Sequence, residues 1–266
     1  MPLCSDIIIE PGLAPRRQQE LNALADTLLA GRLPEDARPV YTGRNKLYVC
    51  RLADGLEVNI KQFRRCSLLK GLIYGRLRRN KALRSLLNAR RLRSLGFDSP
   101  EPLMACWTRS AGGWCLRSAY YVCAQLDDVR ETRCWEEWPD RGPFTDALGR
   151  EMARLFRAGV LFRDFSPGNV LLRNDTAPGD YRFVYVDVNR TDFGVRSRRR
   201  LMSMFQRINI VEAETERLAA ALARAMGWNE RDTRLRALGV LRRFLWKKDT
   251  IQKPVKRFLR SLVGKR

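Results

Sequence analysis

The spacing of apolar residues changes from a helical to an extended period early in the chain. Between Leu13 and Gly31 apolar residues recur at the helical spacing, and a glycine follows the last of them, which predicts a helix. The segments Val40–Cys50 and Leu56–Phe63 then have the character of two strands joined by a turn at residues 53–55.

The middle of the chain predicts one long helix and one buried strand. Leu68–Leu95 has a helical pattern, and Gly96 follows it as a stop. Pro100 and Pro102 indicate a loop. Within Trp114–Leu126 the run Ala-Tyr-Tyr-Val-Cys-Ala is typical of a buried strand.

The second half of the chain is predicted to be mainly helical. Phe144–Ala158 has a helical pattern with Gly159 as its cap, and helical patterns dominate again from about Ser203 onward. Val170–Arg173 and Tyr181–Val188 predict two short strands around a turn that contains proline and glycine. Because strands dominate the first half and helices the second, the pattern favours the α+β class.

The bulk composition is that of a folded protein. The chain has 266 residues, of which 45% are hydrophobic, enough for one large domain or two packed lobes. No apolar run reaches the roughly 18 residues that a transmembrane helix requires. The segment Met1–Glu10 lacks the basic and apolar regions of a secretory signal. We therefore expect neither a transmembrane helix nor a secretory signal in this sequence.

The absence of histidine excludes several kinds of site. The sequence has no histidine and seven cysteines, at positions 4, 50, 66, 106, 115, 123 and 134, none of them with the CxxC spacing. This excludes a Cys/His zinc site and every Ser-His or Cys-His catalytic arrangement. Proton transfer is left to a carboxylate, lysine, tyrosine or cysteine. The cysteines are interpreted as reduced, mostly buried thiols of a cytosolic protein.

The net charge of +22 predicts contact with polyanions: nucleic acid, anionic lipid headgroups or a phosphorylated glycolipid. Lys61–Arg93 contains 12 Lys or Arg and no acid, and Arg234–Arg266 contains 12 more with one acid, Asp249. Apolar residues alternate with the cations of this C-terminal segment, which favours a basic amphipathic helix on an anionic membrane surface. The alternative is a solvated helix that packs its apolar face onto the body of the protein. No motif for binding RNA or DNA is present.

The segment Val160–Leu172 carries the candidate chemistry. It places Asp164 and Asn169 five residues apart on a Ser-Pro-Gly turn between two apolar runs. This arrangement is typical of phosphoryl transfer, in which the carboxylate accepts the proton of a hydroxyl group and the amide oxygen binds Mg²⁺. The alternative interpretation is an ordinary turn, since these residue types are common in turns.

A second metal ligand is expected at the end of a nearby strand. Asp187 follows the apolar run Phe183-Val-Tyr-Val and is therefore the predicted second ligand of Mg²⁺. A literal Asp-Phe-Gly motif also occurs at residues 192–194. No strand is expected to lead into it, since Asn189-Arg190-Thr191 come just before, so Asp192 is interpreted as unrelated to the metal.

These motifs together resemble a known family. Phe165–Leu171, Val186–Arg190 and the pair Phe193-Gly194 resemble the lipopolysaccharide kinase family, whose members phosphorylate Kdo or heptose sugars of the lipid A core. The resemblance covers roughly residues 40 to 210. It implies a two-lobed protein-kinase-like fold, with an N-lobe of a small antiparallel sheet at residues 1–125 and a mainly helical C-lobe at residues 126–266.

The resemblance also implies a nucleotide site for ATP. Lys61, on a strand after a turn and before a helix, is the expected phosphate-binding lysine. The hairpin around Gly43 and Lys46 is the expected phosphate-covering loop. Gln125 follows the strand that resembles the hinge between kinase lobes, whose backbone groups would bind adenine. The implied acceptor is a sugar hydroxyl of lipopolysaccharide core, and the implied location is peripheral, on the cytoplasmic face of the inner membrane.

Two departures from the kinase pattern keep alternatives open. Phe162 stands where the family usually has histidine, and Leu83 and Leu87 stand where a helix acid would pair with Lys61. The alternatives are a pseudokinase that acts as a membrane-associated binding module and a small-molecule kinase of the aminoglycoside phosphotransferase type. Without that acid, either Lys61 is held by Asp187 and the phosphates alone, or the protein is a weak kinase or pseudokinase; the sequence leaves both open.

Overall fold

The structure, a computed structural model, describes residues 4–64, 79–110, 112–133, 135–174, 180–208 and 210–252. The chain forms two compact units. The first comprises Met1–Val129 with Val184–Arg190, and the second comprises Arg130–Phe183 with Thr191–Arg266. The segment that contains Asp187 therefore belongs to the first unit, although in the sequence it lies between the two stretches of the second unit.

The first unit is built on a six-stranded antiparallel sheet. In spatial order its strands are β1 (Cys4–Ile9), β5 (Pro102–Arg109), β6 (Leu116–Ala124), β4 (Glu57–Gln62), β3 (Lys46–Arg51) and β2 (Arg38–Thr42). The sheet thus joins the N-terminal strand to the strands that hold the predicted nucleotide site.

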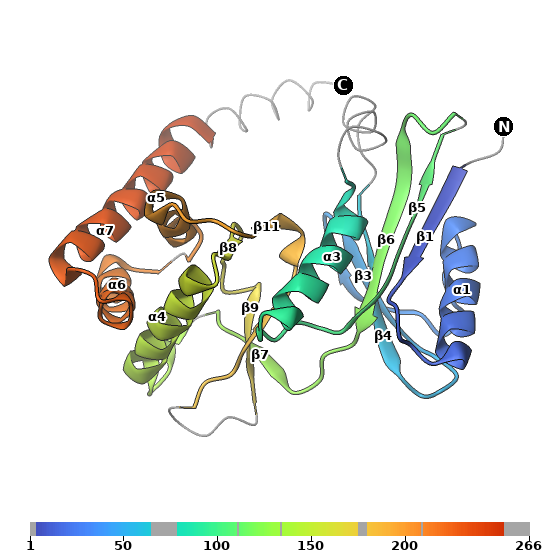
Figure 1. Ribbon diagram of the computed structural model, residues 1–266, viewed down its shortest axis with the longest axis horizontal. Coiled ribbons are helices and arrows are strands. Elements are labelled where there is room, and N and C mark those ends of the chain that lie inside the picture. Colours follow the sequence, from blue (N-terminus) through green and yellow to red (C-terminus); the bar gives the residue numbers. More distant parts are fainter. Residues whose placement is uncertain are drawn as a thin grey trace. The chain divides into compact units, whose positions relative to one another are not determined.

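One helix covers each face of this sheet, α1 (Pro15–Leu29) on one side and α3 (Lys81–Ser94) on the other (Figure 1). Buried Val58 and Ile60 of β4 pack in the cluster that contains the α1 leucines. Side chains alternate along a strand, so Lys61 lies on the α3 face, where its cross-strand partner Tyr121 packs in the cluster of α3. Lys61 and the buried pair Val58 and Ile60 therefore lie on opposite faces of the sheet.

Several predicted elements of this unit match the structure, and others were wrong. The predicted strand Val40–Cys50 is a hairpin of two strands, β2 and β3. Strand β5 begins at Pro102, where a loop was predicted, because proline is tolerated at the first position of a strand. Helix α3 begins after Asn80, whose side chain caps it, and residues 68–78 of the predicted long helix lie outside the described residues.

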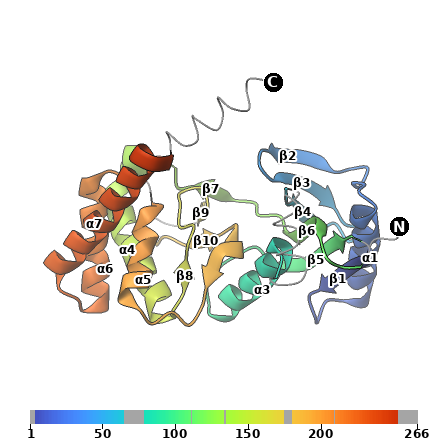
Figure 2. The ribbon, with the colours of Figure 1, turned by 90° about the horizontal axis from the view of Figure 1, so that it is seen from above.

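The second unit is dominated by α4 (Arg141–Arg157), α6 (Glu212–Met226) and α7 (Glu230–Lys247), which pack side by side (Figure 2). A Cβ atom at Gly149 of α4 would lie 2.6 Å from the Ala221 side chain of α6. The close approach of the two helices therefore requires glycine at this position. Shorter helices complete the unit: η2 (Trp135–Glu137), α5 (Arg198–Leu201), η4 (Met202–Gln206) and the π-helix η5 (Lys248–Gln252).

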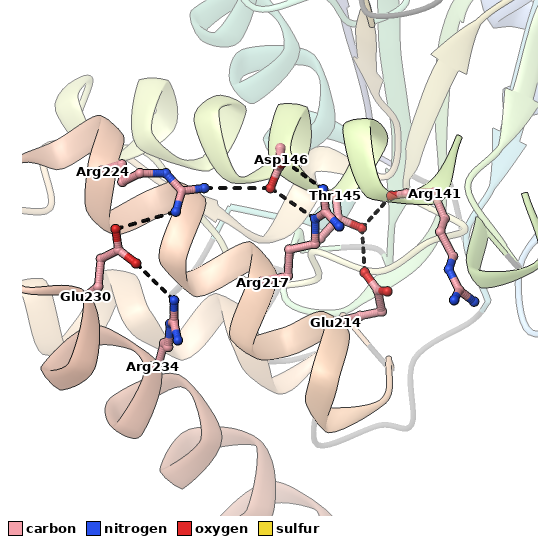
Figure 3. Close-up of polar contacts among 8 residues, drawn as sticks. All are labelled: Arg141, Thr145, Asp146, Glu214, Arg217, Arg224, Glu230 and Arg234. Atoms are coloured by element: carbon pink, nitrogen blue, oxygen red, sulfur yellow. Dashed lines mark hydrogen bonds and ion pairs between the residues drawn. The ribbon is translucent and has the colours of Figure 1, made fainter. Parts of the chain in front are cut away.

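A polar network links the three long helices (Figure 3). Arg217 of α6 donates two hydrogen bonds to Asp146 of α4, at 3.2 and 2.9 Å. On the same helices, the hydroxyl of Thr145 donates to Glu214 at 2.8 Å. Glu230 of α7 accepts from Arg224 and Arg234. The packing of apolar faces fixes the distances between the helices. The polar pairs help to fix the orientation of each helix relative to its neighbour.

Short strands carry the segments between the helices. β8 (Leu161–Phe162) pairs with β11 (Thr191–Asp192), and β9 (Val170–Arg173) lies between β7 (Val129–Glu131) and β10 (Phe183–Tyr185). The helix η3 (Val188–Arg190) follows β10. In the part of the chain that is described, no helix has the length and apolar character needed to cross a membrane.

Candidate active site

The side chain of Lys61 is paired with that of Asp187. Its Nζ atom lies 2.5 Å from Asp187 Oδ1, and both side chains are partly buried. The two residues are 126 positions apart in the sequence. An ion pair with a short charge-assisted hydrogen bond in a partly desolvated place is strong compared with a surface pair. The structure therefore brings together two of the residues predicted for the site.

The backbone at Asp187 is unusual. Its φ angle is +53°, in the left-handed region that non-glycine residues adopt rarely. The expected strand ends earlier than predicted, at Tyr185, so Asp187 stands two residues past β10. A left-handed aspartate persists only when its surroundings hold it, and such positions cluster at functional sites.

Three contacts within the first unit hold this segment. Ser99 Oγ donates to the carbonyl of Tyr185 at 2.9 Å, and the Tyr185 N–H donates to the carbonyl of Asp98 at 2.9 Å. From α3, the amide of Asn88 donates to the carbonyl of Val188 at 2.9 Å. The helix thus supports the Asp187 segment directly, and sequence reasoning missed Asn88 because its partner is 100 residues away.

The carboxylate of Asp187 keeps one oxygen available. Its Oδ1 atom accepts from Lys61 and from Asn189, both at 2.5 Å. The described residues donate no hydrogen bond to Oδ2. This is the arrangement required of a carboxylate that binds a cation with one oxygen while the other is fixed by the protein.

The hairpin before Lys61 is exposed. Gly43 lies in the turn between β2 and β3, where its N–H donates to the carbonyl of Asn45 at 3.2 Å. Lys46 begins β3 as an exposed residue opposite Gln62 of β4. Both residues therefore lie beside the strand that carries Lys61, and their predicted contact with phosphate stays a prediction.

The predicted adenine-binding segment has its first N–H groups occupied. The N–H of Ala124 donates to the carbonyl of Glu101, and that of Gln125 donates to the carbonyl of Glu57, both at 2.9 Å. The side chain of Gln125 also accepts from Asn59 on β4 at 2.9 Å. Gln125 therefore ties the end of β6 to β4, and its N–H is not available to a base in this structure.

The thiol of Cys123 lies on β6, near Lys61 of the neighbouring strand β4. Burial raises the pKa of this thiol to about 12, although the positive charge of Lys61 opposes the shift. The group is therefore protonated and unreactive at neutral pH.

In the second unit, Asp164 and Asn169 lie on one tight turn, as predicted. The side-chain amide of Asn169 donates to the backbone carbonyl of Asp164 at 3.0 Å. The N–H groups of Asn169 and Val170 donate to the carbonyl of Ser166 at 2.8 and 3.0 Å, which closes the turn. The described residues donate nothing to Asn169 Oδ1. This leaves an amide oxygen that fits a hard cation such as Mg²⁺.

Two packed aromatic side chains support the turn of Asp164 and Asn169. Phe162 and Phe165 are buried, and their rings meet edge to face with centroids 6.2 Å apart. Such a contact stabilises by about 0.5–1.5 kcal/mol beyond burial. Phe162 therefore stands at the position of the usual histidine and acts there as a packing residue.

Two residues near the turn were not singled out from the sequence. The buried hydroxyl of Thr132 lies 3.0 Å from the carbonyl of Pro167 and 2.8 Å from that of Val170. The guanidinium of Arg133 lies so close to Gly168 that a Cβ atom there would meet it at 2.3 Å. Both residues follow β7 and fix the backbone on which Asn169 stands.

Asp192 lies in the short strand β11, so the expectation that no strand leads to it was wrong. Its Oδ2 atom accepts from Arg163 at 2.9 and 2.5 Å and from Arg200 at 3.0 Å. Because Arg163 directly precedes Asp164, this cluster connects the turn of Asp164 and Asn169 to β11. A carboxylate held by two arginines is already neutralised, which argues against a metal at Asp192.

A magnesium site would use few protein ligands. Within the described ranges, no three His, Cys, Asp or Glu side chains gather in the way a protein-only metal site requires. Mg²⁺ in kinases commonly takes one or two carboxylates and completes its shell with phosphate oxygens and water. The Asp187 carboxylate of the first unit and the Asn169 amide of the second unit each present an oxygen of this kind.

The chain is similar to proteins of one family. The model of the "Lipopolysaccharide kinase (Kdo/WaaP) family" matches residues 49–225, more than half of the chain. No match was found among curated proteins.

Solved structures extend the likeness beyond this segment. The structure "WaaP in complex with acyl carrier protein" matches with a TM-score of 0.60 at 16% identity, over 92% of this chain and 98% of that chain. At this identity the likeness establishes the fold. The Rio2 kinase–ADP/Mg²⁺–phosphoaspartate complex from Chaetomium thermophilum matches at a TM-score of 0.49 with 15% identity, over 94% of this chain and 76% of that chain. That likeness is too slight to establish anything further.

Proposed function

Because this chain belongs to the lipopolysaccharide kinase (Kdo/WaaP) family and has the predicted α+β kinase-like fold, we propose that it transfers the γ-phosphate of ATP to a sugar hydroxyl of lipopolysaccharide core. The acceptor sugar in this proposal is Kdo or heptose. The proposed enzyme class is a phosphotransferase with an alcohol group as acceptor, and the cosubstrate is ATP with Mg²⁺.

The observation that carries the proposal is the Lys61–Asp187 pair at 2.5 Å, with Asp187 held in a left-handed conformation. A partly buried lysine paired with an aspartate just past the end of a strand has an evident use in a nucleotide site, where the lysine binds phosphate and the aspartate a cation. The left-handed backbone at the carboxylate supports a functional role, because such conformations cluster at functional sites.

Each residue has a proposed role in transfer. Lys61 would bind the phosphates of ATP, and exposed Lys46 with the Gly43 turn would cover them. Asp164 would orient the acceptor hydroxyl and accept its proton as the hydroxyl oxygen forms a bond to the γ-phosphorus and the bond to the ADP oxygen breaks. Adenine would be bound by backbone groups near Gln125 other than its own N–H, which is occupied.

Asn169 and Asp187 would hold Mg²⁺. The ion supplies charge neutralisation on the phosphate oxygens when it is bound. The protein's part is to present the oxygens of these two side chains in fixed orientations. The backbone carbonyl of Asp164 holds the Asn169 amide. Lys61 and Asn189 hold the Asp187 carboxylate. Magnesium removal is therefore expected to abolish transfer.

The proposed location is the cytoplasmic membrane face, where the glycolipid acceptor would be. On α7, Trp246 is exposed beside Lys247 and Lys248, which fits contact with anionic lipid. However, Ala237, Leu238 and Leu241 of α7 are buried, and this part of the helix belongs to the core of the second unit. The apolar residues beyond position 252 lie outside the described residues.

This burial determines how membrane binding should be tested. A deletion from residue 235 would remove core residues and unfold the protein. Trp246→Ala combined with Lys247→Gln and Lys248→Gln leaves the core intact and should weaken binding to vesicles that contain anionic lipid. Unchanged vesicle binding would contradict the role of the C-terminal segment and leave the kinase proposal standing.

The experiment that tests the kinase proposal is transfer from radiolabelled Mg-ATP to isolated lipopolysaccharide core. The full chain should label the acceptor, and Asp164→Ala should lose about 10²–10⁴-fold in rate while it keeps nucleotide affinity. Asp146→Ala, which removes a carboxylate on α4 that pairs with Arg217 of α6, is the control for general destabilisation. Full activity of Asp164→Ala would contradict the proposed catalytic role.

The same assay separates the alternatives. Mg-ATP binding without transfer to any acceptor would favour a pseudokinase, which Phe162 and the leucines at positions 83 and 87 allow. Transfer to a soluble aminoglycoside but not to the glycolipid would favour the small-molecule kinase. The match of the family model favours the glycolipid acceptor.

A further inference from the structure

Arg207 is placed beside the proposed catalytic base. Its Nε atom lies 4.0 Å from Asp164 Oδ1. The residue directly follows η4, and its N–H donates to the carbonyl of Met204 at 3.2 Å. Met204 and Phe205 of that helix are buried. The backbone of Arg207 is therefore anchored to the core of the second unit.

The side chain of Arg207 is also positioned. Its guanidinium lies 5.4 Å from the ring centroid of Phe244 on α7, within the range of a cation–π contact. The side chain is nevertheless 45% exposed. An arginine that is fixed at both its backbone and its guanidinium loses little entropy when it binds a further group, which is the property of a preorganised binding residue.

Neighbouring arginines have a different environment. Arg163 and Arg200 both donate to the single carboxylate of Asp192 at 3.0 Å or less, so each already has a hydrogen-bonded acidic partner. Among the described residues, the carboxylate nearest to Arg207 is that of Asp164, at the outer limit of an ion pair. A guanidinium has five N–H donors, and a single oxygen at 4.0 Å satisfies none of them with normal hydrogen-bond geometry.

A cation at this place does not assist proton transfer by itself. A positive charge near a carboxylate favours its ionised form and makes it a weaker base. The planar fork of arginine instead matches an anionic oxygen pair on a ligand. An anion bound there would lie within a few ångströms of the base, where the reacting hydroxyl must be.

We infer that Arg207 binds an anionic group of the acceptor, a sugar carboxylate or a sugar phosphate, and thereby places the neighbouring hydroxyl against Asp164. This inference rests on the proposed function. It assigns the enzyme a preference for acidic sugar acceptors over neutral ones.

The test compares acceptors and variants. Core oligosaccharide is used intact, with its carboxyl groups reduced to alcohols, and after enzymatic removal of its phosphates. Arg207→Ala should raise the acceptor KM on the order of tenfold or more, as expected for a lost charged hydrogen bond, and leave the KM for ATP unchanged. Arg207→Lys should recover only part of the loss, because a point charge lacks the bidentate fork.

The chemically altered acceptors identify the anion. If the group is a carboxylate, wild-type protein should show the raised KM with the reduced acceptor, and Arg207→Ala should add no further loss. The same pattern with the dephosphorylated acceptor would assign a phosphate. Arg236→Ala removes an exposed arginine paired with Asp232 on α7 and serves as the matched control, with an unchanged acceptor KM.

Failure of this inference is distinguishable from failure of the proposed function. A wild-type enzyme that phosphorylates the acceptor while Arg207→Ala keeps its acceptor KM within about twofold would overturn the inference alone. If wild-type protein transfers no phosphate, calorimetric titration with intact oligosaccharide provides the readout. Binding that Arg207→Ala loses and Arg236→Ala retains would support the site, and equal binding by both variants would overturn it.

Discussion

The two clusters of candidate site residues obtain their geometry in different ways. Asp164 and Asn169 are five positions apart, and hydrogen bonds inside one turn bring them together. Lys61 and Asp187 are 126 positions apart, and their pairing depends on a sheet, a helix and a segment from late in the chain. The first arrangement is local, and the second exists only in the folded first unit.

The supports of the two clusters differ as well. The catalytic turn is held mainly by apolar packing, with Phe162 and Phe165 buried beneath it. The Asp187 segment is held mainly by hydrogen bonds from Asn88 and Ser99 to backbone carbonyls. Substitutions beneath the turn should therefore change stability, and substitutions around Asp187 should change nucleotide affinity more than stability.

The largest effect is expected from Phe162→Ala. Truncating a buried phenylalanine leaves a cavity and costs about 3–5 kcal/mol. The free energy of unfolding, measured in urea, should fall by this amount. Phe162→Leu keeps most of the apolar volume and is expected to lose much less. Equal losses for the two variants would show that the turn does not depend on the packing of this ring.

The next effect is expected from Asp187→Asn. The substitution leaves Lys61 without its counter-charge and removes a carboxylate from the proposed cation site. Loss of one partner of a buried charged pair costs about 2–5 kcal/mol, so Mg-ATP affinity in a binding titration should fall on the order of 30-fold or more.

Asp192→Asn is the matched control for this substitution. It weakens the contacts with Arg163 and Arg200 and should leave Mg-ATP affinity nearly unchanged. The opposite result, with affinity lost in Asp192→Asn and retained in Asp187→Asn, would assign the metal to the literal Asp-Phe-Gly motif.

The difference between local and long-range geometry also explains what the sequence predicted. Strand Val170–Arg173 and the turn that carries Asn169 were predicted because their signals lie within a few neighbouring residues. The α+β class followed from hydrophobic periodicity alone. The kinase-like fold was indicated by two motifs in combination, which the family match supports.

The misses have long-range causes. The partner of Lys61 was left open because the helix acid usual in kinases is absent, and no local pattern replaces it. Strand β11 has two residues, and pairing with β8 alone defines it. Strand β1 was missed because its residues become a strand only by pairing with β5, about 100 positions later. Propensity carries no information on such pairs.

A smaller effect is expected from the thiol of Cys106, which is buried in the sheet of the first unit. Burial raises the pKa of Cys106 to about 12 from an ordinary value of 9.0. Its stabilising contribution is therefore complete below pH 9 and is lost as the pH rises from 9 toward 12, because the unfolded chain releases the proton first. Between about pH 8 and about pH 10, this thiol alone should cost about 1.4 kcal/mol.

The measurement compares wild type with Cys106→Ala in urea at both pH values. The variant should show a correspondingly smaller loss of unfolding free energy, whatever other groups titrate in both proteins. Parallel losses would indicate that water reaches the thiol in the native state.

The smallest effect is expected from Asn88→Ala, which tests the long-range support of Asp187 most directly. The variant removes the hydrogen bond from α3 to the Val188 carbonyl, worth about 0.5–1.5 kcal/mol. Mg-ATP affinity should fall about two- to tenfold, because the Asp187 carboxylate loses part of its fixed orientation. Ser94→Ala removes a hydroxyl contact at the exposed end of the same helix and should change nothing. If both variants bind Mg-ATP like wild type, α3 contributes no positioning to Asp187, and the Lys61 pair and the left-handed backbone hold the carboxylate without it.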